Sequence, residues 1–222
     1  MTQKLPGGVA VALALSIGAA AQSGNGAQPR AKLSLDQPAP LVIDRALPSG
    51  GTVSLDLNVG DVKILPSAAT GHVRLEIDPN GFYDQQTLQG WVRRFDVDPV
   101  SATIQLELPK NNHGHSSPEV ALYVPATADL RISLGVGDLN IHGIRGDKDL
   151  HVGVGDLTIA LDDTPDYGHV EISTRIGDVH DPLNPAGQHG FLGQNEDFVL
   201  KGRYRLRATV GVGDVRPVRR SG

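Results

Sequence analysis

The sequence of 222 residues contains no cysteine, so no disulfide can stabilise the fold and no cysteine can carry the lipid of a bacterial lipoprotein. Aromatic residues make up only 4% of the chain, which predicts a core filled by Val, Ile and Leu. The formal net charge is a mild −5, and no long basic block occurs before the segment Arg216 to Arg220. Nucleic acid is therefore not an expected partner.

Catalytic signatures are absent as well. The chain has no Gly-x-Ser-x-Gly, His-Glu-x-x-His or phosphate-loop motif, and a cysteine nucleophile is excluded. Acidic pairs such as Asp162-Asp163 fall in predicted turns. We expect neither an enzyme nor a cofactor. A glycan-acting enzyme on a stacked-strand fold is an alternative that rests on analogy of fold alone.

The longest apolar run, Val9 to Ala21, follows a short basic start and ends in three alanines. This pattern predicts a secretory signal peptide over residues 1–21. The polar, Ser-, Gly- and Pro-containing residues 22–40 predict a flexible linker, and residues 41–222 a single β-repeat domain. No second run approaches the length of a membrane span, so we expect a mature chain without a transmembrane segment, exported to the periplasm, the cell envelope or the extracellular space.

One pattern occurs five times. In residues 150–159, aliphatic side chains alternate with other residues up to a Gly-Asp pair, and the alternation resumes after the pair with its parity shifted. The five pairs are Gly60-Asp61, Gly137-Asp138, Gly155-Asp156, Gly177-Asp178 and Gly213-Asp214. The step from the second pair to the third is 18 residues, and the step from the fourth to the fifth is 36, twice as long. Internal repeats of about 20 residues are typical of stacked strand units.

We interpret each Gly-Asp pair as a two-residue turn that closes a tight ribbon of two strands. In such a ribbon Val154 faces Leu157, and Val152 faces Ile159, so that all four line one apolar face. The predicted fold class is all-β: a β-solenoid or β-roll-like stack of Gly-Asp-turn strands, with dense repeats over residues 129–215. An antiparallel meander or a sandwich is the alternative that the pattern leaves open.

One segment breaks the β pattern. Over residues 84–95, apolar side chains recur with helical spacing at Leu88, Trp91, Val92 and Phe95. Asp84 is placed to cap the N-terminus of a helix. We predict a short amphipathic helix that lies against the sheet and buries the only Trp.

The two ends of the domain differ from the dense repeats. Residues 41–65 are predicted to form the first ribbon. Residues 181–197 are predicted to be either an edge loop or a repeat whose pattern has decayed. The basic, Pro-bearing end after Val215 would discourage edge-to-edge pairing with another molecule.

The Gly-Asp pairs are the first candidates for a functional role. We assign a structural role in the turns to Gly60, Gly137, Gly155, Gly177 and Gly213, because glycine adopts positive φ without steric cost. The alternative is a row of carboxylates that binds Ca²⁺, with the candidate ligands Asp61, Asp138, Asp156, Asp178 and Asp214. The Gly-Gly-x-Gly-x-Asp spacing of calcium-binding β-rolls is absent, so we expect no metal.

Histidines and one tripeptide complete the candidates. His151 and His169 lie one repeat apart, and His113 and His115 share a polar loop. Zinc needs three or four convergent ligands, and this spacing does not guarantee convergence, so we assign these histidines to solvent-facing positions on strands. Arg145-Gly146-Asp147 matches a cell-attachment tripeptide, but its Gly-Asp falls where the opposite end of a ribbon must turn.

The strands punctuated by Val-Gly-Asp-Val or Val-Gly-Asp-Leu, together with Tyr123-Val-Pro-Ala126 and Leu130-Arg-Ile132, resemble the exported bacterial "putative adhesin" repeat family. The resemblance covers roughly Leu41 to Val215. It implies an all-β repeat domain in the envelope or outside the cell, and it carries over no catalytic residues. The chain departs from the family pattern at three glycines that stand where Ser or Thr often precedes the turn: Gly135, Gly153 and Gly211.

These patterns together predict an exported, non-enzymatic protein that acts as an interaction or structural module of the cell envelope. Its partner would be an envelope protein or a glycan, and its oligomeric state is left open. A Ca²⁺-dependent adhesin is the first alternative, and the glycan-acting enzyme is a more distant one.

Overall fold

The computed structural model describes residues 39–47, 51–79, 83–109, 118–161, 166–180 and 192–218. The predicted signal peptide, nearly all of the predicted linker, the loop histidines His113 and His115, and the pair Asp162-Asp163 lie outside these ranges. Within the described ranges the chain forms fifteen strands and one short helix. The predicted all-β fold class is therefore confirmed.

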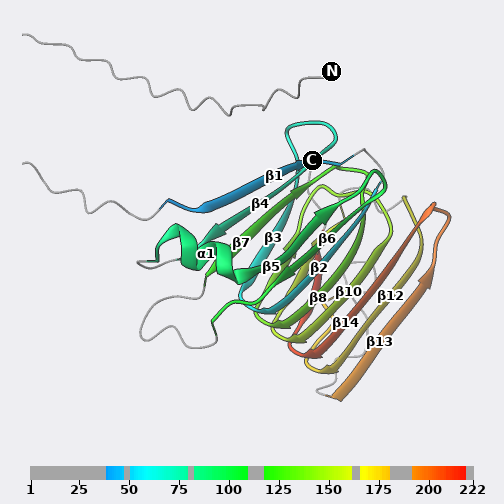
Figure 1. Ribbon diagram of the computed structural model, residues 1–222. Helices are drawn as coiled ribbons and strands as arrows, with labels where there is room; N and C mark the ends of the chain where they lie inside the picture. The colour runs from blue at the N-terminus through cyan, green and yellow to red at the C-terminus, as the bar shows by residue number, and fades with distance from the viewer. Residues whose placement is uncertain are drawn as a thin grey trace, which may run out of the picture. The chain divides into compact units, whose positions relative to one another are not determined.

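The strands form two mixed sheets (Figure 1). Sheet A has seven strands in the order β1 (Leu41–Ala46), β4 (His72–Asp78), β7 (Glu119–Val124), β3 (Asp61–Pro66), β9 (Leu139–Ile141), β11 (Leu157–Ala160) and β15 (Val215–Val218). Sheet B has eight strands in the order β13 (Leu192–Val199), β12 (Tyr167–Ile176), β14 (Tyr204–Val212), β10 (Lys148–Val154), β8 (Asp129–Val136), β2 (Thr52–Val59), β6 (Ser101–Leu106) and β5 (Val92–Val97). Side chains from both sheets meet in one apolar core.

The chain passes from sheet B to sheet A at the Gly-Asp pairs. β10 pairs in parallel with β8 and β14 in sheet B, whereas β11, which follows Gly155-Asp156, pairs in parallel with β9 and β15 in sheet A. The prediction of a tight hairpin is therefore wrong, because the strands on the two sides of a pair bond to neighbouring repeats and not to each other. A two-stranded ribbon is marginally stable in water, and stacking the repeats into two facing sheets buries far more apolar surface.

The repeats do not stack in chain order. Along the stack the five turn glycines follow one another as Gly60, Gly137, Gly155, Gly213 and Gly177. The reason is that β14 lies between β10 and β12 (Figure 1). After β11 the chain forms β12 and the antiparallel β13, then returns to fill the gap with β14 and β15, which accounts for the double-length step. The simple solenoid is thus not confirmed, and parallel pairing of the repeats argues against the antiparallel meander.

In-register stacking places equivalent positions of the repeats on top of one another. Leu150 pairs with Ile132 on one side and Ala208 on the other, and all three side chains are buried. Val154 has the same parity, but its side chain is 46% exposed. The prediction that Val154 lines the apolar face is wrong, because β10 ends there and the chain bends toward sheet A.

The helix α1 (Gln85–Trp91) is shorter than predicted. Asp84 caps it as expected: its Oδ1 accepts a hydrogen bond of 2.7 Å from the Thr87 N–H, and Trp91 is buried. The predicted continuation to residue 95 is wrong, because Val92–Val97 forms β5 and pairs with β6. Pairing with an exposed sheet edge outweighs the helical spacing of these β-branched and aromatic residues. No helix within the described residues is long and apolar enough to cross a bilayer.

Two further predictions are corrected at the ends of the domain. Residues 41–65 do not form one ribbon, since β1 pairs with β4, β2 lies in sheet B and β3 lies in sheet A. β13 begins at Leu192, inside the segment 181–197 predicted as an edge loop or decayed repeat, and it runs to Val199 as an antiparallel strand that borders β12. Residues 181–191 lie outside the described ranges. An antiparallel edge strand ends the parallel stack without offering it to a further repeat.

The glycines that depart from the family pattern lie where neighbouring repeats approach closely. A Cβ on Gly153 would lie 2.5 Å from the carbonyl oxygen of Gly135, and a Cβ on Gly211 would lie 2.4 Å from that of Gly153. Neither Ser nor Thr fits at these positions. The first repeat has Asn58 there instead, and its amide side chain makes two hydrogen bonds of 2.8 Å with the backbone of Leu108. Asn58 therefore continues the hydrogen-bond ladder at the end of the stack.

Candidate functional site

The five Gly-Asp pairs form a line that we call the Gly-Asp corner. Its five glycines have φ angles between 134° and 137°, in the region that favours glycine. A Cβ on Gly155 would also lie 2.0 Å from the carbonyl oxygen of Gly137. Backbone conformation and close stacking therefore both require glycine at this position.

The aspartates of the corner hold successive repeats together. Oδ1 of Asp61 accepts a hydrogen bond of 3.1 Å from the Asp138 N–H, and Oδ1 of Asp138 accepts one of 2.9 Å from the Asp156 N–H. Asp156 and Asp214 continue the series, each accepting a bond of 3.0 Å from the aspartate of the next repeat along the stack. Backbone donors thus reduce the repulsion expected in a row of carboxylates. This geometry favours hydrogen bonding over Ca²⁺ ligation as their role.

Arg216 places positive charge beside the same row. Its guanidinium nitrogens lie 3.1 Å from Asp156 Oδ2 and 2.8 Å from Asp214 Oδ2. The pKa of Asp214 is held below its usual value, first by the hydrogen bond from the Asp178 N–H and then by hydrogen bonds from His180 and Arg216. A cation bound between Asp156 and Asp214 would have to compete with this guanidinium.

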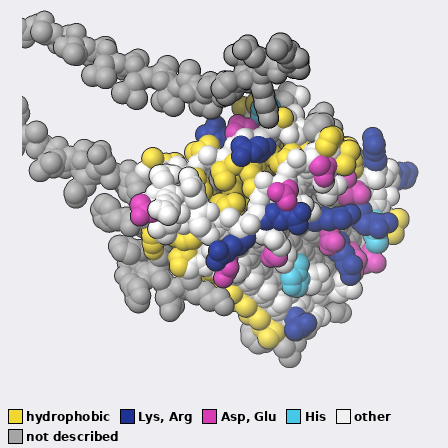
Figure 2. All heavy atoms as spheres, in the orientation of Figure 1, with side chains coloured by type: hydrophobic (Ala, Val, Ile, Leu, Met, Phe, Trp, Pro, Cys, Tyr) yellow, Lys and Arg dark blue, Asp and Glu magenta, His cyan; other side chains and the backbone are white. Residues whose placement is uncertain are grey.

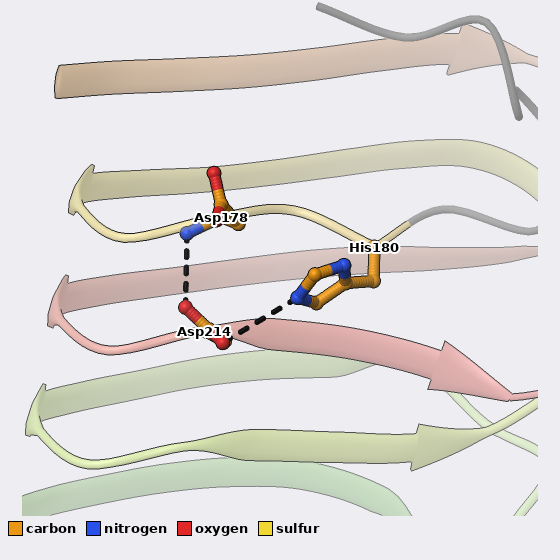
Figure 3. A group of neighbouring side chains, drawn as sticks. All are labelled: Asp178, His180 and Asp214. Carbon is orange, nitrogen blue, oxygen red and sulfur yellow. Dashed lines mark hydrogen bonds and ion pairs between the residues drawn. The ribbon is translucent and has the colours of Figure 1, made fainter. Parts of the chain in front are cut away.

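Three side chains that could ligate a metal converge at the end of the corner. Asp178, His180 and Asp214 bring their ligand atoms within 4.8 Å of one another (Figure 3). Nε2 of His180 lies 3.4 Å from Asp214 Oδ2, while the Asp178 N–H donates to the other oxygen of that carboxylate. Protein donors already engage both oxygens of Asp214, so these contacts serve to join two repeats. His180 was not a predicted ligand, and its signal in the sequence is its place two residues after the last-stacked Gly-Asp pair.

The tripeptide Arg145-Gly146-Asp147 lies at the opposite end of β10. The Asp147 N–H donates to Asp129 Oδ1 at 2.9 Å, and Asp147 Oδ1 accepts a hydrogen bond of 2.8 Å from the Arg205 N–H. A Cβ on Gly146 would lie 2.3 Å from the carbonyl oxygen of Ala128. This glycine and aspartate repeat the chemistry of the Gly-Asp corner, which explains their presence without a role in attachment.

Lys148 follows the tripeptide and is only 2% exposed. Its Nζ donates to the carbonyl oxygens of Ile144 at 2.7 Å and Gly146 at 3.2 Å, and to the hydroxyl of Tyr167. Burial lowers the pKa of Lys148 to about 8, and the negative charges of Asp129 and Asp147 oppose the shift. The ammonium group joins the segment before β10 to the start of β12.

A shallow hollow of about 340 Å³ lies on the outer face of sheet B, across β6, β2, β8 and β10. Eight outward side chains line it in two rows that follow the strand register. The first row is Thr103, Ser54, Arg131 and Asp149, and the second is Gln105, Asp56, Ser133 and His151. Neighbouring positions within a row are about 4.8 Å apart. We refer to these eight residues as the hollow.

Within the part of the chain that the structure describes, the eight side chains of the hollow make no hydrogen bond or ion pair. The other half of the same face differs. Arg207 Nε lies 3.5 Å from Glu171 Oε2, and His169 Nε2 lies 2.8 Å from Asp197 Oδ1. Polar groups therefore pair with one another over β12, β13 and β14, but remain available over β6, β2, β8 and β10.

Acidic and basic side chains are interspersed on this face. Figure 2 shows Lys and Arg side chains in a band across this view, with Asp and Glu side chains directly beside the band on both sides. In the hollow, Arg131 and Asp149 occupy paired positions on β8 and β10. The hollow thus offers hydrogen-bond donors and acceptors at fixed spacing and suits a polar ligand better than a polyion.

The histidines flagged in the sequence do not come together. His151 lies on β10 and His169 on β12, with β14 between these strands. His169 contacts Asp197, whereas His151 lines the hollow. Both occupy solvent-facing positions on strands.

The hollow has no linear motif, because its residues come from four strands spread between positions 54 and 151. The signal that could have revealed it lies in equivalent positions of neighbouring strands, not in the order of residues along one strand. Once the repeats are stacked in parallel, the outward residues of equivalent positions form rows, and these rows are rich in polar groups. Reading the rows requires the strand order, which the periodicity of a single strand does not contain.

No family model and no curated protein matches the chain. Among solved structures, it is similar to a "putative cell adhesion protein" from Clostridium sporogenes, with 14% identity, coverage of 82% of this chain and 100% of that one, and a TM-score of 0.47. Two further structural neighbours are described as adhesins. One is a "putative adhesin" from Bacteroides fragilis, with 9% identity, 81% and 97% coverage and a TM-score of 0.28. The other, from Parabacteroides distasonis, has 15% identity, 55% and 57% coverage and a TM-score of 0.28.

Proposed function

We propose that this protein is an exported, non-enzymatic, adhesin-like module that presents the outer face of sheet B to a partner in the cell envelope. The observation that carries the proposal is the hollow, where eight polar side chains have no partner among the described residues. These groups give up no internal hydrogen bond when they bind. They also stand on a hydrogen-bonded sheet, so the backbone beneath them does not have to become ordered on binding.

Two sequence features support the location of this module. Residues 1–21 have the pattern of a secretory signal peptide, and residues 22–40 have the composition of a flexible linker. We further propose that the in-register repeats act as a solenoid-like scaffold, held by the Gly-Asp corner, whose purpose is to keep the outer face of sheet B rigid.

The two alternatives receive less support. Asp56 and Asp149 are the carboxylates of the hollow, but they lie two strands apart and in different rows, so that their Cα atoms are separated by about 12 Å. Outward side chains stand roughly perpendicular to a sheet, so the two carboxyl groups lie about as far apart as the Cα atoms, whereas the two carboxyl groups of glycosidases lie roughly 5–9.5 Å apart. For a Ca²⁺-dependent adhesin, the candidate aspartates of the corner would have to exchange backbone hydrogen bonds for the ion.

The proposal is tested with labelled full-length protein and envelopes isolated from the cells that produce it. We expect saturable binding that unlabelled protein displaces. Protein that remains in the supernatant at every envelope concentration would contradict the proposed function. Fractionation of the same cells tests export, which requires the chain to be found outside the cytoplasm and shortened at its N-terminus.

A further inference from the structure

We propose that the hollow binds a neutral, polyhydroxylated glycan whose chain runs across β6, β2, β8 and β10. This inference rests on the proposed function and names the chemical class of the partner. The outward groups of the hollow are two carboxylates, one guanidinium, one imidazole, one primary amide and three hydroxyls. Every sugar hydroxyl both donates and accepts, so a surface that mixes strong donors with strong acceptors matches it.

The pairing of donors and acceptors follows from the register. Arg131 on β8 lies opposite Asp149 on β10, and Ser133 lies opposite His151 two residues further along. Two neighbouring hydroxyls of one sugar can therefore donate to Asp149 and accept from Arg131. Since Arg131 forms no ion pair with a described residue, the five N–H donors of its guanidinium remain available.

The charges of the hollow disfavour an acidic polymer. Asp56 and Asp149 would repel its acidic groups, and the single guanidinium of Arg131 does not balance both carboxylates. A neutral chain meets no like charge. The same argument disfavours sulfated and uronic acid glycans.

The dimensions suit a short stretch of chain. A volume of about 340 Å³ lies at the lower end of the range of roughly 300–1,000 Å³ found for small-molecule sites. Adjacent strands are about 4.8 Å apart, which is close to the length of one pyranose residue in an extended glycan. A glycan laid across the strands would therefore meet an equivalent outward position with each successive sugar.

The residues that line the hollow include no aromatic ring. Stacking of a sugar on an aromatic side chain therefore does not contribute, and the affinity depends on hydrogen bonds and on contacts with the aliphatic parts of the lining. We expect weak binding at a single site and stronger retention when many copies meet many glycan chains.

The first experiment separates glycan from protein as the partner. Labelled full-length protein is incubated with envelopes that are untreated, oxidised with periodate, which cleaves vicinal diols, or digested with proteinase. We expect periodate to lower the bound fraction at least tenfold. Loss after both treatments also supports the proposal, since the glycan is then carried on a protein. Binding that is lost after proteinase but not after periodate overturns the glycan assignment but not the proposed function, whereas no binding to untreated envelopes overturns both.

The second experiment locates the site. Arg131→Ala and Asp149→Asn change exposed side chains of the hollow and are each expected to lower envelope binding at least fivefold without shifting the urea midpoint. Arg207→Ala is the matched control, because Arg207 continues the same row on β14 but contacts Glu171 and lies outside the hollow. We expect this control to bind within twofold of the unchanged protein. Equal losses for Arg131→Ala and Arg207→Ala would overturn the assignment to the hollow.

The third experiment tests the charge class. The protein, displayed on beads, is offered immobilised neutral oligosaccharides (cellohexaose, hexa-N-acetylchitohexaose and maltohexaose) and polygalacturonate as an acidic polymer. We expect retention on at least one neutral glycan and none on polygalacturonate. Retention on polygalacturonate alone, or on none of the four, would overturn the neutral class.

Discussion

The Gly-Asp corner and the hollow are built on the same strands and use their polar groups in opposite ways. At the ends of β8 and β10, Asp138 and Asp156 accept hydrogen bonds from the backbone of the next repeat. Within these strands, Arg131 and Asp149 have no partner among the described residues. The stack therefore has one edge where polar groups form hydrogen bonds between repeats. It also has one face where polar groups have no partner among the described residues.

This difference follows the repeat itself. Glycine and aspartate recur at the corner in each repeat, because each must fit against the repeat before it. The outward positions of sheet B change from repeat to repeat, as in the row Ser54, Arg131, Asp149, Arg207 and Glu171. The recurring glycines and aspartates of the corner hold the repeats together, and the varied outward residues of sheet B determine which polar groups the face presents.

The largest effect is expected at the corner. Gly155→Val should lower the free energy of unfolding by about 3 kcal/mol or more, since it adds a β-branched side chain at φ 137° and places Cβ 2.0 Å from the Gly137 carbonyl oxygen. Urea unfolding followed by circular dichroism measures the change.

Gly193→Ala provides the comparison with a positive-φ glycine that no neighbouring strand approaches. Gly193 has φ 63°, and a Cβ there meets nothing within 4 Å. We expect a loss of about 1 kcal/mol. If Gly155→Val lost no more stability than Gly193→Ala, close stacking at the corner would be refuted.

The next effect concerns Lys148, which is buried at the opposite end of β10. Its pKa is about 8 in the folded protein and about 10.5 in the unfolded chain. Between these values the unfolded state holds the proton and the folded state does not, so stability should rise as the pH rises from 8 to 10.5, by up to about 3 kcal/mol. Lys148→Met should remove this rise. Parallel pH profiles of stability for the two proteins would contradict the burial of the ammonium group.

A smaller effect is expected for the carboxylate ladder. Asp138→Ala removes the acceptor of the Asp156 N–H at a solvent-accessible position and should cost about 1 kcal/mol. Asp138→Asn keeps an oxygen in place and should cost less than half as much. Urea midpoints of the two variants give the comparison, and equal losses would mean that charge, not hydrogen bonding, is what the corner requires.

No effect is expected from removing divalent cations. Because backbone N–H groups and Arg216 already engage the corner carboxylates, EDTA should leave the melting temperature unchanged. A large drop in the melting temperature that added Ca²⁺ reverses would instead support the Ca²⁺-dependent adhesin. The corner would then bind a ligand, as is proposed for the face.

Much of the local structure could be predicted from short patterns. Alternation at Leu150 and Val152 predicted a strand with one buried face, and Asp84 predicted the start of the helix, because both depend on neighbours in the chain. The end of the helix was predicted wrongly, because Val92 begins a strand that pairs with β6, and β6 comes later in the chain. The hollow could not be predicted, because Asp56 and His151 become near neighbours only when β8 lies between their strands.

The sequence by itself determined that this protein is built of aliphatic strands joined by Gly-Asp pairs, because side-chain alternation and the conformational freedom of glycine act over a few residues. Only the tertiary structure decided that each pair crosses between two sheets, that β14 enters the stack between β10 and β12, and which outward side chains lie together. The physical reason is that backbone hydrogen bonds between parallel strands are nearly indifferent to sequence. Which strands pair, and in which order they lie in each sheet, is therefore set by packing across the whole core.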